Sequence, residues 1–273
     1  MPSPDAITVA QLSRLVGTPD APSIVDVRIA EDRVLDPRTL PASIDRDFRT
    51  VRDWAGEYAG RWVVVVCQRG QKLSQGVAAW LRQSGARAEN LEGGFEAWVQ
   101  AEALLVKPEQ VPPRDSDGRT VWVTRARPKI DRIACPWLIR RFIDPGAVFL
   151  FVAPSEVSAV AERFGATPFD VEGIFWSHRG ETCTFDAMLD EFGLDSPALN
   201  RLATIVRGAD TARLDVAPEA AGLLAASLGL SRMFRDDLAQ LDAAMLLYDS
   251  FYRWARDATA ETHNWPATSG SRA

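Results

Sequence analysis

A run of four valines at residues 63–66, followed by Cys67, is the feature that most constrains the fold of this chain. An uninterrupted run of β-branched residues is typical of a strand that is buried on both faces of a sheet. A polar loop around Gly70 follows, and apolar residues then recur at helical spacing from Leu73. This order predicts a parallel α/β sheet with Cys67 at the carboxyl end of a central strand, where open sheets of this kind bind ligands.

Cys67 has two interpretations at this stage. A lone cysteine at the end of an apolar strand is commonly a small buried hydrophobe. Alternatively, the loop amides and the start of the next helix favour negative charge, which lowers the pKa of a thiol and makes it a nucleophile. The second interpretation is favoured because the thiol is followed by polar residues and two cations that packing does not require: Gln68, Arg69, Gly70, Gln71 and Lys72.

The segment from Cys67 to Lys72 resembles the active-site loop of rhodanese-type sulfurtransferases, a Cys-x-x-Gly pattern with a basic residue near its end. The stretch Asp26-Val27-Arg28 resembles the first-strand signature of that family. The stretch at 91–95 (LEGGF) resembles its last strand and turn. The resemblance covers residues 5 to about 103, although residues 40–44 (LPASI) replace the histidine-containing segment of many members.

This resemblance implies a rhodanese-like parallel sheet with helices on both faces. It also implies that Cys67 is the catalytic nucleophile and carries a persulfide. Thiosulfate or a similar donor would bind at Gln68, Arg69, Gly70, Gln71 and Lys72, and a thiol would accept the sulfur. Sulfur transfer of this kind requires no cofactor.

A second unit follows a stretch rich in proline and mixed charges. We expect a rhodanese-like domain at residues 1–105, a semi-extended linker at 106–119, a second domain at 120–257 and a flexible tail at 258–273. The apolar patterns of the second domain predict strands near 120–124, 147–152 and 169–176, with helices through most of the chain from residue 184. Its class is therefore mainly helical α+β with a small sheet.

The densest basic stretch of the chain opens this second unit, with six cations and one acid within residues 125–141. One interpretation is a solvated face whose cations pair with acids elsewhere. The other is an oxyanion site at Arg127, Lys129 and Arg132, because guanidinium groups recognise tetrahedral dianions such as chromate, sulfate and thiosulfate. The net charge of −6 for the whole chain disfavours a nucleic-acid partner.

His178 is one of only two histidines in the chain. It lies close in sequence to Cys183 and Asp186, and Asp131 and Cys135 could approach these residues in space. Imidazole, thiolate and carboxylate ligands together suit zinc or iron, so these five residues are a candidate metal or redox site. The spacing matches no standard zinc finger, and a hydrogen-bonded structural histidine is the alternative.

Four segments of the second unit resemble the C-terminal domain of the B-type chromate-resistance proteins. They lie at residues 127–145, 175–178, 183–186 and 205–211, and the resemblance runs from about 120 to 257. It implies a role in chromate or oxyanion stress and specifies no reaction. Two hypotheses follow. The chain is a sulfurtransferase linked to that stress, or a chromate-responsive sensor or regulator whose rhodanese unit is a binding or redox module.

The location of the protein is predicted from its cysteines and its N-terminus. Three cysteines, a low and odd number, argue against a disulfide framework and favour a reducing compartment. The first eight residues show neither the basic nor the apolar region of a signal peptide, and the apolar runs are too short to cross a bilayer. We therefore expect a cytoplasmic protein without a membrane partner, and its oligomeric state stays open.

Overall fold

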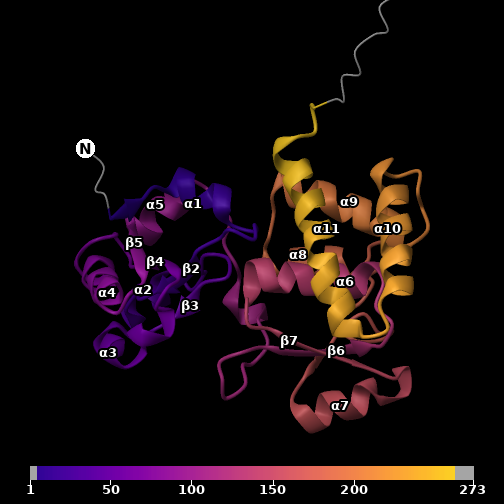
Figure 1. Ribbon diagram of the computed structural model, residues 1–273, viewed down its shortest axis with the longest axis horizontal. Coiled ribbons are helices and arrows are strands. Elements are labelled where there is room, and N and C mark those ends of the chain that lie inside the picture. Colours follow the sequence, from indigo (N-terminus) through magenta and orange to yellow (C-terminus); the bar gives the residue numbers. More distant parts are fainter. Residues whose placement is uncertain (1–4, 262–273) are drawn as a thin grey trace, which may run out of the picture.

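The computed structural model describes residues 5–261, in which two units lie next to each other (Figure 1). In the first unit, strands alternate with helices along the chain. Its elements are β1 (Ala6–Ile7), α1 (Val9–Leu15), β2 (Ser23–Asp26), α2 (Ala30–Leu35), β3 (Ile44–Asp45), α3 (Val51–Trp54), β4 (Trp62–Val66), α4 (Lys72–Gln83), β5 (Arg87–Leu91) and α5 (Gly94–Gln100).

The strands of the first unit form one parallel sheet in the order β1-β5-β4-β2-β3. Its central strand, β4, contains the four valines, and their side chains alternate between the two faces. Val64 and Val66 pack in the apolar layer of α1 and α5, whereas Val63 and Val65 pack against α3 and α4. Helices therefore cover both faces, and the predicted rhodanese-like α/β sheet is confirmed.

The second unit contains a smaller sheet and most of the helical residues. Its elements are β6 (Val121–Arg125), α6 (Ile130–Leu138), a π-helical turn (Ile139–Ile143), β7 (Val148–Val152), α7 (Val157–Phe164), β8 (Thr167–Pro168), α8 (Thr184–Phe192), α9 (Pro197–Asp210), α10 (Glu219–Met233) and α11 (Asp237–Asp257).

The small sheet has the order β7-β6-β8, with parallel pairings. Helix α7 covers one face, and the other face lies toward the bundle that contains α6, α8 and α11 (Figure 1). Neighbouring residues of β6 separate these layers, because Val123 packs with α7 while Trp122 belongs to the large apolar cluster of the bundle. The predicted class of this unit, mainly helical with a small sheet, is confirmed.

The strand predicted at residues 169–176 is wrong, because most of this segment is a loop. Asp170 and Gly173 adopt left-handed backbone conformations, with φ of +53° and +80°, which interrupt an extended chain. The amide of Asp170 donates to the carbonyl of Trp176 at 2.8 Å and closes the loop. The loop therefore turns back on itself immediately before His178.

The stretch predicted to be a linker is held in place by both units. Thr39 pairs with Val106 in an isolated β-bridge, and the amide of Lys107 donates to the carbonyl of Phe192 at 3.0 Å. One apolar cluster continues through both units and includes Trp98 of α5 and Phe142 of the π-helical turn. The two units therefore share buried surface.

The part of the chain that the structure describes ends at residue 261, so most of the tail predicted at 258–273 lies outside it. Within residues 5–261, no helix is both long enough and apolar enough to span a bilayer.

Candidate functional site

Cys67 occupies the first position after β4, at the carboxyl end of the sheet. Its side chain is 4% exposed and belongs to the same apolar cluster as Val27 and Val77. Its Sγ atom donates to the Oγ atom of Ser74 at 3.1 Å, and Ser74 in turn donates to the carbonyl of Gln71 at 3.2 Å. The thiol is therefore held between the strand and the first turn of α4.

Two glycines allow the loop after Cys67 to pack closely against the start of α5. Gly70 and Gly94 have φ of +65° and +62°. A Cβ on Gly70 would lie 2.4 Å from the carbonyl oxygen of Leu91, and one on Gly94 would lie 2.2 Å from the carbonyl oxygen of Cys67. The amide of Phe95 also donates to the Cys67 carbonyl at 3.0 Å. The close approach of the two backbones therefore requires glycine at both positions.

The backbone amides of this loop indicate a binding site for an anion. The amides of residues 68–72 donate no hydrogen bond to any other described residue. Helix α4 begins after Gln71 without a side-chain cap, so the N–H groups of its first turn are also left without that partner. Unpaired amides and the positive end of a helix dipole together favour negative charge at this place.

The two cations of the loop differ in whether they have a carboxylate partner. Arg69 pairs with Glu96 of α5 at 3.2 Å, and the same carboxylate accepts from the side-chain amide of Gln68 at 3.3 Å. Lys72 is exposed and makes no ion pair with any described residue. Lys72 is therefore the loop cation that is available to an incoming anion without breaking an existing pair.

The arginines of the basic stretch at 125–141 are paired with carboxylates of the second unit. Their partners within 4.0 Å are Asp170 for Arg125 and Arg132, Asp237 for Arg127, Asp242 for Arg140, and Asp249 for Arg141. Arg127 also donates to the carbonyl of Phe234 at 3.0 Å, and Lys129 is exposed. This pairing matches the interpretation of a basic face whose cations bind acids elsewhere, because Arg127 and Arg132 each have a carboxylate partner.

A polar cluster around His178 is the second candidate site. The Nε2 atom of His178 lies 3.4 Å from Asp131 Oδ2, 3.5 Å from Asp170 Oδ1 and 3.2 Å from Asp210 Oδ2. Asp131 lies in the first turn of α6, and Asp210 is the last residue of α9. Asp170 lies at the start of the loop after β8, and His178 directly follows that loop. Three carboxylates and one imidazole therefore meet where these segments pack together.

The carboxylates of this cluster lie close together and shift the pKa values of its members. Contact with the Asp131 carboxylate raises the pKa of His178 to about 9, against the opposing effect of partial burial. Burial raises the pKa of Asp210 to about 7, and the neighbouring charges of Asp131 and Asp170 act in the same direction. Burial likewise raises the pKa of Asp170.

Three of the residues predicted to join His178 as ligands lie outside this cluster. Cys135 and Cys183 are buried, and burial raises the pKa of each thiol, which disfavours the thiolate that a metal needs. Asp186 pairs with Arg207 at 2.8 Å. Asp170 and Asp210 lie beside His178 instead, and neither was predicted from the sequence. Asp210 had a signal, because it lies inside the segment at 205–211, whereas Asp170 lies inside the segment at 169–176 that was predicted to be a strand.

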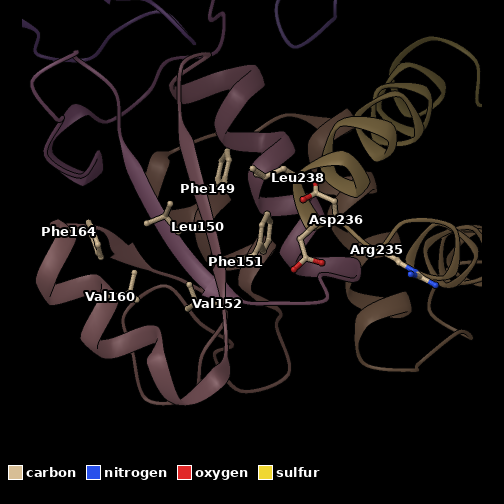
Figure 2. A pocket seen from close by; sticks show the side chains of 10 residues that line it. Phe149, Leu150, Phe151, Val152, Val160, Phe164, Arg235, Asp236 and Leu238 are labelled. Atoms are coloured by element: carbon tan, nitrogen blue, oxygen red, sulfur yellow. The ribbon is translucent and has the colours of Figure 1, made fainter.

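An apolar hollow of about 540 Å³ lies apart from both sites, beside β7 and the start of α11 (Figure 2). Phe149, Phe151 and Leu238 contribute to its wall. The acids at its rim already have structural partners, since Asp236 accepts from the amide of Ala239 at 2.7 Å and caps α11. The hollow brings no reactive group to the two candidate sites.

Two family models match the chain, one in each unit. The profile described as "Rhodanese-like domain" matches residues 8–101, and that described as "ChrB, C-terminal domain" matches residues 122–255. Among solved structures, a rhodanese-like domain protein from Staphylococcus aureus is 27% identical, with 34% of this chain and 90% of that chain covered and a TM-score of 0.31. A rhodanese-related protein from Thermoplasma volcanium is 22% identical, with coverage of 37% and 96% and a TM-score of 0.32.

The parallel sheet, the cysteine at the end of β4 and the loop packed against the start of α5 define a rhodanese-like protein that carries a second, mainly helical unit. Protein ChrB of Cupriavidus metallidurans is 31% identical to the chain over 240 residues, which are 76% of this chain and 71% of that protein. The chain belongs to the ChrB family, the B-type chromate-resistance proteins that its second unit resembles in sequence.

Proposed function

We propose that the rhodanese-like unit is a sulfurtransferase and that Cys67 carries the transferred sulfur as a persulfide. The observation that supports this most directly is the set of amides at residues 68–72, directly after Cys67 in the chain, which donate to no described residue. The outer sulfur of a persulfide bears negative charge, and preorganised N–H donors stabilise such charge without reorganisation during the reaction. A cysteine with only a packing role has no need for that arrangement.

The proposed reaction has two steps with thiosulfate as the donor. The Cys67 thiol first loses its proton to solvent, and the thiolate attacks the outer sulfur of thiosulfate. A new S–S bond forms, the original S–S bond breaks, and sulfite leaves with the electron pair. An acceptor thiolate then attacks the outer sulfur of the persulfide and releases the Cys67 thiolate. Both steps exchange S–S bonds, so the transfer needs no cofactor.

The donor's oxyanion end would lie against the loop amides and Lys72. Arg69 could contribute only by sharing Glu96, its present partner at 3.2 Å. The arginines of the second unit pair with carboxylates, which favours the loop as the place where the donor anion binds. Membership of the ChrB family supports a role of this chemistry in chromate or oxyanion stress, with chromate as a further candidate ligand.

The test is the intact mass of the full chain after incubation with thiosulfate. We expect the wild type to gain one sulfur atom and Cys67→Ser to gain none. Cys183→Ser is the matched control, because it removes another buried thiol and should load sulfur like the wild type. A gain that survives in Cys67→Ser, or no gain in the wild type, would contradict the proposal. In the second case, a chromate-responsive regulator becomes the better hypothesis.

A further inference from the structure

The cluster around His178 has a geometry that the sulfur chemistry at Cys67 does not use. We propose that Asp131, Asp170 and His178 bind one divalent transition-metal ion in the second unit, with Asp210 beside His178 at the edge of the site. The inference goes beyond the proposed sulfur transfer and does not depend on it.

The distances around His178 fit ligands that share an ion. Its Nε2 atom lies 3.2–3.5 Å from one oxygen of each carboxylate. Atoms bound to one metal ion at about 2.1 Å lie roughly 3.0–3.4 Å from one another in octahedral or tetrahedral geometry. A single N–H group, by contrast, carries one hydrogen and cannot serve three carboxylates at once. The ligand atoms of Asp131, Asp170 and His178 also lie within 4.8 Å of one another. The convergence of these groups is therefore better explained by a shared cation.

Asp131 provides independent evidence for a ligand at this place. Its side chain is 1% exposed, and its Oδ1 atom is buried without a hydrogen-bond partner among the described residues. A buried carboxylate oxygen without a partner is costly, because it has lost water and gained no compensating contact. The other oxygen of the same carboxylate faces His178 at 3.4 Å, so a cation in the cluster would lie beside this group.

The charges of the cluster are also unbalanced. Asp170 has two cationic partners, Arg125 and Arg132, each at 3.2 Å. Among the described residues, His178 is the only ion-pair partner within 4.0 Å of either Asp131 or Asp210. Even a protonated imidazole would supply one positive charge for two carboxylates. A divalent cation would supply the remaining charge.

Thr184 at the start of α8 orients two of the proposed ligands. Its amide donates to Asp131 Oδ2 at 2.6 Å, and its hydroxyl donates to Asp170 Oδ1 at 3.0 Å. Hydrogen bonds of this kind hold carboxylates in place around metals. The site is also open to solvent on one side, since the side chain of His178 is 40% exposed. An ion could enter there and keep water as a further ligand.

The ligand types indicate the class of metal. Two carboxylates and one imidazole, with no thiolate, suit Mn²⁺ or Fe²⁺ better than a structural zinc site rich in cysteine. This revises the zinc-or-iron site predicted with Cys135 and Cys183, because neither thiol belongs to the cluster. Mn²⁺ is the practical probe, since it is stable in air and visible by electron paramagnetic resonance.

The experiment is a titration of the chelator-treated full chain with Mn²⁺, in which the resonance signal of the free ion is measured. We expect the wild type to bind one equivalent. Asp210 and His178 lie at the accessible edge of the site. Asp210→Asn and His178→Ala should each weaken binding by roughly tenfold or more. Circular dichroism of each variant checks that the fold is kept.

Cys183→Ser is the matched control, because serine can keep the helix-capping role of Cys183 and the thiol lies outside the proposed ligand set. Its affinity for Mn²⁺ should equal that of the wild type. Absence of stoichiometric binding by the wild type would overturn the proposal, and so would equal affinity of the wild type, Asp210→Asn and His178→Ala. A tenfold loss in Cys183→Ser would instead show that the ligand set is wrong.

Discussion

The amide nitrogen of Gly70 lies 2.4 Å from the point that a Cβ atom on Gly94 would occupy. The cysteine loop and the start of α5 are therefore packed backbone against backbone. The shape of the loop, with its amides unpaired, depends on this contact between two segments that follow different strands.

Gly94→Ala should consequently destabilise the protein by roughly 2–5 kcal/mol, because it combines a left-handed backbone with a steric clash. It should also abolish sulfur loading of Cys67. Urea unfolding and intact mass measure the two effects. Gly76→Ala is the control, since Gly76 lies within α4 with open space around its Cα, and alanine there should stabilise by about 0.5–1 kcal/mol. Equal stability of the two variants would contradict the close backbone packing at Gly94.

Lys72→Ala should raise the KM for thiosulfate by roughly three- to fivefold and leave kcat unchanged, because an exposed cation contributes about 1 kcal/mol or less to binding an anion. Steady-state kinetics with varied thiosulfate separates the two parameters. Lys129→Ala removes another exposed lysine, in the second unit, and should change neither. A loss confined to kcat in Lys72→Ala would place Lys72 in the chemical step instead.

Phe142→Ala should destabilise both units, because this fully buried side chain lies where they meet. The ring contacts the position of Gly17, and the carbonyl of Phe142 accepts from the amide of Ala42 at 2.6 Å. We expect a loss of about 3–5 kcal/mol in the free energy of unfolding. Hydrogen exchange followed by mass spectrometry should show faster exchange in α1 as well as in α6. Phe164→Ala is the exposed control, and faster exchange limited to the second unit would refute the shared core.

Thr184→Val should weaken Mn²⁺ binding by roughly 10- to 100-fold, since it removes the hydroxyl that orients Asp170 but none of the proposed ligands. The same resonance titration measures it. Thr204→Val is matched in chemistry, because within residues 5–261 the hydroxyl of Thr204 bonds only to a carbonyl of its own helix, at 3.0 Å. Unchanged affinity in Thr184→Val would mean that the hydroxyl does not position the site.

Sequence reasoning succeeded for the first unit because its decisive features are local. The valine run, the loop and the following helix are consecutive, so their order alone predicts the position of Cys67 at the end of β4. The contact between Gly70 and Gly94 could not be derived in this way, since it depends on how two loops from neighbouring strands approach each other.

The second unit shows the limit of the same reasoning. Proximity in sequence grouped His178 with Cys183 and Asp186. In the structure, Cys183 is the buried N-cap residue of α8, and Asp186 pairs with Arg207. The cations at 125–141 form a dense stretch in sequence, but they lie on a strand, a loop and helical turns and pair with four different acids, Asp170, Asp237, Asp242 and Asp249. Spacing along a chain does not specify which face of a helix meets which neighbour.

The sequence by itself determined the parallel α/β class, the place of Cys67 and the membership of the second unit in its family, because these depend on short-range patterns and long continuous motifs. Only the tertiary structure decided that Asp131, Asp170, His178 and Asp210 meet. These residues come from a helix start, a loop and a helix end, and they become neighbours only when the apolar faces of α6, α8 and α9 pack together and bury the carboxylates between them.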